Sequence, residues 1–168
     1  MLELDHVWSK MLDEAAFKAS NAGRQDIVDY LRLKATNDAI RKAGVAWLFD
    51  TVIEIASDEL RDRRGITIER EEPHNFARGN SNMVGSLLEI RQGVRCLSVE
   101  AGWARTPSDG IMLSGALAFA RIAHFGMPKF ATEIRLVHGD SLPQWLGEDG
   151  SIVESSEISR HFEIFLGS

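Results

Sequence analysis

The stretch GNSNMVGSLLEIRQGVRCLSVEAGW, residues Gly79–Trp103, decides the fold class of this chain. Two runs rich in apolar residues, Val84–Arg91 and Val94–Trp103, flank the pair Gln92-Gly93. A two-residue hairpin turn needs a positive φ angle, which glycine adopts without steric cost. We therefore predict an antiparallel β-hairpin with Gln92-Gly93 as its turn, entered by a polar loop.

Side chains alternate between the two faces of a strand, and the predicted hairpin sorts cleanly by this rule. One face is apolar and is expected to point to the core; it carries Val84, Ser86, Leu88, Ile90, Leu97, Val99 and Ala101. The other face is mostly polar and carries Gly85, Leu87, Glu89, Arg91, Cys96, Ser98 and Glu100. With the turn at Gln92-Gly93, Leu88 lies opposite Leu97, and a slip of one residue would mix the two faces.

The composition fits one ordinary domain. The chain has 168 residues, enough for a substantial core, and we predict a single domain over residues 1–168. A formal net charge of −6 and a pI of about 5.4 argue against broad nucleic-acid binding, which depends on Lys and Arg. Cys96 is the only cysteine, so an internal disulfide is excluded and the chain fits a reducing compartment.

The sequence carries no targeting or cofactor motif that we recognise. Its first residues lack the basic and apolar regions of a signal peptide, and no run approaches the roughly 20 apolar residues that span a bilayer. We therefore expect a cytoplasmic protein without a membrane partner. The absence of Cys/His clusters, of a phosphate-binding loop and of a nucleophile elbow leads us to expect neither a metal nor a cofactor.

Helical spacing dominates residues 1–63. Apolar residues recur at helical intervals over Glu3–Ala22, and Gly23 is suited to end that helix. Arg24–Arg63 is expected to hold one or two more helices, with Gly44 as a kink or a break, since glycine weakens a helix interior by about 1 kcal/mol. The short join at Gly23 predicts an antiparallel helical hairpin.

Residues 64–168 are expected to form the sheet. Ile66–Glu72 alternates and indicates a strand that Pro73 ends. Gly115–Gly126 is compatible with helix or strand, but a turn after it and the alternating run Phe130–His138 favour a second hairpin, which can place Arg121 opposite Glu133.

The C-terminal quarter is expected to be mostly loop and to close with a strand. The predicted elements are a loop over Leu142–Glu157, a short element at Gln144–Leu146 and a final strand at Arg160–Leu166. Helices followed by strands are typical of α+β proteins. We thus expect an α+β fold in which an N-terminal helical hairpin or long helix packs on one face of a mostly antiparallel sheet of about five or six strands.

Two polar loops form the first candidate site. The loops 74–82 and 103–109 leave the predicted hairpin at the same end, so they should be neighbours. Arg78 and Arg105 could converge there on a carboxylate or phosphate. The candidate ligand-binding residues are His74, Asn75, Arg78, Asn80, Asn82, Trp103, Arg105 and Asp109. The alternative is that the polar residues build turns and the arginines make surface ion pairs.

The polar sheet face is the second candidate. Its residues are Glu89, Arg91, Ser98, Glu100, Arg121, Glu133 and Arg135, with Phe119 among them. Glu100 and Glu133 could act as an acid–base pair if they lay close together and were desolvated. The alternative is a solvated face crossed by ion pairs. The histidines are scattered in the sequence, and Cys96 is expected to be a small buried side chain.

The sequence is compatible with two functions. The first is a non-catalytic interaction or regulatory domain that self-associates, because large apolar side chains are abundant and a C-terminal edge strand could pair with a second chain. The alternative is a small polar or anionic ligand-binding protein, or an enzyme, that uses the loops 74–82 and 103–109. The expected partners are therefore a second copy, another protein or a small polar ligand, and a nucleic-acid role lacks a basic stripe.

Overall fold

The computed structural model describes residues 10–15, 17, 25–112, 115–139 and 142–167. The chain divides into two compact units, Met1–Lys42 and Ala43–Ser168. In the first unit, the described residues of the expected helix Glu3–Ala22 are helical, while the remainder of that helix and the turn at Gly23 lie outside the described residues. The first unit also contains the start of helix α2 (Gln25–Glu59), in which Arg41 pairs with Asp38 at 2.8 Å.

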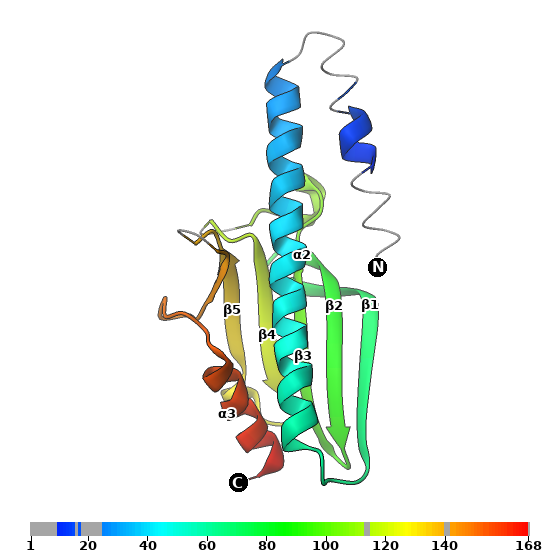
Figure 1. The fold of residues 1–168 in the computed structure, drawn as a ribbon, viewed down its shortest axis with the longest axis vertical. Coiled ribbons are helices and arrows are strands. Elements are labelled where there is room, and N and C mark those ends of the chain that lie inside the picture. The colour runs from blue at the N-terminus through cyan, green and yellow to red at the C-terminus, as the bar shows by residue number, and fades with distance from the viewer. Residues whose placement is uncertain (1–9, 16, 18–24, 113–114, 140–141, 168) are drawn as a thin grey trace. The chain divides into compact units, whose positions relative to one another are not determined.

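The second unit is an antiparallel sheet with helices on one face. In its described residues the six strands follow the order of the chain, so that each strand pairs with the next: β1 (Ile66–Arg78), β2 (Ser81–Gln92), β3 (Arg95–Trp103), β4 (Ala118–His124), β5 (Thr132–Val137) and β6 (Gln144–Leu146). The part of α2 from Ala43 onward and the helix α3 (Ser155–Leu166) lie on the same face of this sheet (Figure 1). The expected α+β class with an antiparallel sheet is confirmed.

The helices bury the apolar face of the sheet. From α2 the buried side chains include Val45, Leu48, Phe49, Val52 and Ala56, and from α3 they include Ile158, Phe162 and Phe165. The sheet contributes Leu88, Ile90, Leu97, Val99, Ala101, Ala120, Ile122, Ile134 and Leu136. Each fully buried large side chain contributes roughly 1.5–3 kcal/mol, so this interface dominates the stability of the unit.

The central hairpin has the predicted faces and a different turn. Gln92 pairs with Arg95, so the turn is Gly93-Val94, with Gly93 at φ +61°. Leu88 accordingly faces Val99 rather than Leu97. The predicted register was wrong by two residues, but side chains alternate with a period of two, so every residue still points to its predicted face.

The prediction of a polar loop at residues 74–82 was wrong, because most of this stretch is strand. β1 continues through Pro73 to Arg78, and a tight turn at Gly79-Asn80 leads directly into β2. The pairing with β2 shifts between Glu71 and His74, which is a β-bulge. Pro73 is tolerated there because β1 is an edge strand and a bulge leaves a residue outside the ladder.

The prediction of a final strand at Arg160–Leu166 was also wrong, because these residues belong to the helix α3. Its buried residues Ile158, His161, Phe162 and Phe165 follow helical spacing. Near the start of the helix, the Glu157 carboxylate accepts a hydrogen bond of 2.7 Å from the Glu154 backbone N–H. Two other expected elements are confirmed: β4 and β5 form the second hairpin with Arg121 opposite Glu133, and β6 is the short element at Gln144–Leu146.

The sheet curls toward its polar face. Arg78 on β1 donates to Glu133 on β5 at 2.7 Å, although four strand spacings in a flat sheet would separate their backbones by about 19 Å. Gly85 and Gly102 lie directly opposite each other in β2 and β3. A Cβ atom on Gly85 would lie 1.8 Å from the Ala101 carbonyl oxygen. The two glycines therefore allow the close backbone approach at this bend.

We predict that Gly85→Ala destabilises the protein by about 3 kcal/mol or more, because the new methyl group meets backbone that cannot rotate away. The measurement is the urea midpoint of unfolding. Ser98→Ala, on the same sheet face and partly exposed, serves as the control and should cost less than 1 kcal/mol. Equal midpoints for the two variants would contradict the close approach.

Candidate functional site

The curled sheet brings the two predicted candidate groups together. His74 and Arg78 lie over the polar sheet face, where His74 Nε2 is 2.8 Å from Glu100 Oε2. The Arg78 guanidinium donates to Glu133 Oε1 at 3.0 and 2.7 Å and stacks 3.6 Å from the centroid of the Phe119 ring. In the β1–β2 ladder Asn75 pairs with Val84 and Asn82 pairs with Ala77, and Asn80 is in the turn.

The second predicted loop contacts the first, because the Asn82 side chain hydrogen-bonds to the Asp109 carboxylate. Trp103 is buried at the end of β3, and the Arg105 guanidinium stacks on its ring at 3.8 Å. Arg105 also donates to the Val84 carbonyl oxygen at 3.0 Å. Asp109 accepts hydrogen bonds from the Thr106 backbone N–H and hydroxyl, both at 3.2 Å. Arg78 and Arg105 thus have separate protein partners, and a shared anion site between them stays a prediction.

The polar sheet face is crossed by ion pairs. The pairing of the strands aligns Glu100, Arg121 and Glu133 in one row across β3, β4 and β5. Within β2, Glu89 forms an ion pair with Arg91, and Arg135 of β5 donates to the Gly147 carbonyl oxygen at 3.2 Å. A hollow of about 180 Å³ borders this row.

The carboxylates of that row are already engaged. Glu100 contacts His74 and Glu133 accepts from Arg78, and both pairs are partly buried, which is the paired arrangement expected of a structural face. An acid–base role for Glu100 with Glu133 stays a prediction. Cys96 is buried, and burial together with its hydrogen bond to Glu89 raises the pKa of the thiol. Because the thiolate is the reactive form, this cysteine is poorly suited to act as a nucleophile.

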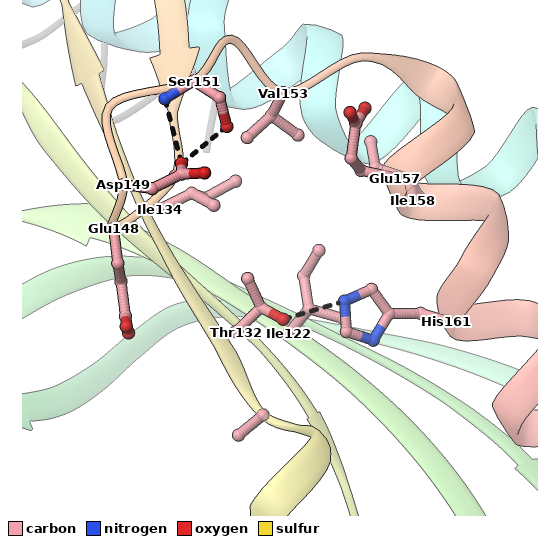
Figure 2. A pocket seen from close by; sticks show the side chains of 12 residues that line it. Ile122, Thr132, Ile134, Glu148, Asp149, Ser151, Val153, Glu157, Ile158 and His161 are labelled. Atoms are coloured by element: carbon pink, nitrogen blue, oxygen red, sulfur yellow. Dashed lines mark hydrogen bonds between the residues drawn. The ribbon is translucent and has the colours of Figure 1, made fainter.

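A pair of buried histidines forms a site that sequence reasoning missed. His124 Nε2 on β4 lies 3.0 Å from His161 Nδ1 on α3, with the rings stacked 5.2 Å apart. His161 Nε2 lies 3.1 Å from the Thr132 hydroxyl oxygen. Figure 2 shows the His161 ring directed toward Thr132 at the edge of a pocket of about 310 Å³. Glu148, Asp149 and Glu157 are among the polar residues that line it.

The histidine pair is electrically neutral at physiological pH. Burial, together with the neighbouring His124 and Arg160, lowers the pKa of His161 to about 4, and burial also lowers the pKa of His124. A general base works best with a pKa near the working pH, so His161 is poorly matched to activating the Thr132 hydroxyl. The arrangement therefore serves better as a hydrogen-bonded link between α3 and the sheet than as catalytic machinery.

An apolar groove lies on the helix-bearing side of the unit, between α2 and the segment that follows β5. Its volume is about 640 Å³. Trp47, Leu142 and Ile152 line it and are 43%, 71% and 49% exposed. Gly44, Leu136 and Trp145 line it as well, and the Trp145 indole N–H donates to the Gly44 carbonyl oxygen at 2.9 Å. Because large exposed apolar side chains are gathered around it, this groove is a candidate interaction surface.

Neither a metal-binding cluster nor a similar known protein indicates a function for the described part of the chain. In the described part of the chain, no group of three or more His, Cys, Asp or Glu residues is arranged to hold a metal ion. Among the described helices, none combines the length and hydropathy that crossing a membrane requires. Comparisons with protein-family models, with curated proteins and with solved structures found no match to this chain.

The histidine pair predicts a loss of stability in mild acid. The folded-state pKa of His161, about 4, lies below the ordinary histidine pKa of about 6.5, so the unfolded chain binds a proton that the folded protein excludes. The contribution of the neutral His161 to the free energy of unfolding is therefore fully present above pH 6.5 and is lost as the pH falls toward 4. Between pH 7 and pH 5 we expect a decrease of about 2 kcal/mol in the free energy of unfolding.

Urea unfolding of the wild type and of His161→Gln across this pH range measures the effect. The variant should lose most of the pH dependence, although its stability at pH 7 is lower. His138→Gln, which changes an exposed histidine, should keep the wild-type dependence. A wild-type stability that does not change between pH 7 and pH 5 would refute the neutral histidine pair.

Proposed function

We propose that this protein is a non-catalytic interaction domain that binds an apolar segment of a partner protein in the groove beside α2. The observation that carries the proposal is the exposure of Trp47, Leu142 and Ile152 around one groove. Large apolar side chains exposed singly need no explanation, but a contiguous set around a concavity is typical of a docking site.

The other large aromatic side chains of the described residues are either buried or lie away from the groove. Most of those expected to drive association are buried: Phe49, Trp103, Phe119, Trp145, Phe162 and Phe165. Phe17, Phe125 and Phe130 are exposed, at 69%, 78% and 36%, but none of them lines the groove. Among the described aromatic side chains, Trp47 is therefore the one that is exposed and also lines the groove.

The chemistry of the groove favours binding over catalysis. Its polar lining consists of Thr51, Glu54, Gln144, Glu154 and Ser155. Its two carboxylates, Glu54 and Glu154, are exposed, and among the described lining residues there is no histidine or lysine to activate the hydroxyls and no arginine to clamp an anion. We therefore place recognition of a partner, and not turnover of a substrate, at this surface.

Two further expectations belong to this proposal. The cytoplasmic location is supported by a single, buried thiol in a chain that cannot form an internal disulfide. Self-association also stays a prediction, although the edge strand that motivated it is a helix; the mass of the intact protein in native mass spectrometry checks it.

We predict that Trp47→Ser weakens binding of a 20-residue helical probe, with leucines on one face and glutamines on the other, by about tenfold or more. The reason is that Trp47 is the largest exposed apolar side chain at the groove, and such aromatic anchors dominate interface energies. Fluorescence anisotropy of the labelled probe gives the dissociation constant for each variant.

Phe125→Ser is the matched control, because it removes an exposed aromatic side chain away from the groove. It should leave the affinity unchanged. Failure of the probe to bind the wild type at high micromolar concentration, or equal weakening by both substitutions, would overturn the proposed docking site.

A further inference from the structure

We infer that the partner segment is a basic amphipathic α-helix; this inference rests on the proposed function and names the chemistry of its partner. Two independent features of the groove carry it. The first is the sign of the charge on both walls, and the second is the absence of an open strand edge along the wall formed by β6.

The two segments that form the walls of the groove carry acidic residues and no basic ones. In the part of α2 that packs on the sheet, Ala43–Glu59, the charged residues are Asp50, Glu54, Asp58 and Glu59. In the segment Leu142–Ser159 they are Glu148, Asp149, Glu154 and Glu157. Neither segment contains a lysine, an arginine or a histidine. Glu54 and Glu154 line the groove itself and are exposed.

This charge pattern selects among partners. A surface of one sign attracts a partner of the opposite sign and raises the rate of its association. A second copy of this chain would bring the same carboxylates against each other, which is costly without compensation. The groove therefore fits a segment that combines an apolar stripe with lysine or arginine side chains at its edges.

The backbone of the groove wall favours a helix over a strand. On the outer side of β6, Leu146 forms a bridge with Ile152, and the Val153 N–H donates to the Trp145 carbonyl oxygen at 2.8 Å. The chain's own return segment thus covers the edge to which a partner strand would add. A partner must then satisfy its own backbone hydrogen bonds, as a helix does.

The spacing along α2 matches such a helix. Trp47, Thr51 and Glu54 are separated by four and three residues, so they lie on one face of α2, and all three line the groove. An apolar side chain of the partner can therefore meet Trp47 while a cationic side chain one or two turns along meets Glu54. The apolar contact supplies most of the affinity, and the charges set the selectivity.

The test compares three 20-residue peptides that share one leucine face and carry lysine, glutamine or glutamate on the polar face. At 50 mM salt the lysine peptide should bind at least tenfold more tightly than the glutamine peptide, and the glutamate peptide should bind most weakly. The difference should shrink at 0.5 M salt, where exposed charges are screened. The circular dichroism of the bound lysine peptide should be helical.

Variants locate the effect. Glu54→Gln combined with Glu154→Gln should bring the affinity of the lysine peptide close to that of the glutamine peptide, with both peptides measured on the same variant. Glu69→Gln combined with Glu71→Gln removes two exposed carboxylates from β1, away from the groove, and should change neither affinity.

The outcomes separate the two proposals. If the lysine and glutamine peptides bind equally and Trp47→Ser weakens both, the basic partner is refuted and the docking groove stands. If none of the peptides binds, the docking groove itself is refuted. If the β1 variant weakens lysine-peptide binding as much as the groove variant does, or if the bound peptide is extended, the inference fails.

Discussion

The close approach of α2 to β5 and β6 at Gly44 is the constraint on which the second unit depends. A Cβ atom on this residue would lie 2.5 Å from a methyl carbon of Leu136, which is itself buried. The Gly44 carbonyl oxygen accepts the hydrogen bond of the Trp145 indole. Glycine weakens the helix by about 1 kcal/mol, but it lets the helix lie against the sheet and fixes Trp145 beneath the groove.

The two faces of the sheet have different physical roles. On the helix-bearing face, apolar burial supplies the stability, and the histidine pair links α3 to β4 within that core. On the polar face, the bend at Gly85 and Gly102 lets β1 reach across, so that Arg78 and His74 pair with carboxylates of other strands. The polar face therefore satisfies its own charges, whereas the groove leaves large apolar side chains in solvent.

Local patterns predicted much of the fold. The period of two assigned the faces of the central hairpin correctly even though the turn was placed one residue early, and the pairing of Arg121 with Glu133 followed from the same reasoning. The rule failed where one pattern fits two structures. Phe162, Ile164 and Leu166 alternate as in a strand, but Ile158, His161, Phe162 and Phe165 follow the helical period that the fold uses.

The sites were harder to predict, because they combine distant parts of the chain. His124 and His161 are far apart in sequence, and their contact could be anticipated only if Arg160–Leu166 were read as a helix. Trp47 lines the same groove as Leu142 and Ile152, which come from a distant part of the sequence. The extension of β1 past Pro73 was hidden because a proline ends most strands, and only a bulge on an edge strand accommodates it.

The indole N–H resonances of the tryptophans test the central claim most directly. In a nitrogen-15 spectrum recorded with increasing leucine–lysine helix, our account predicts shifts for Trp47 and Trp145, which line the groove, and none for Trp103, which does not. Shifts at Trp103 alone, or an unchanged spectrum at saturating peptide, would contradict the assignment of the groove as the binding surface.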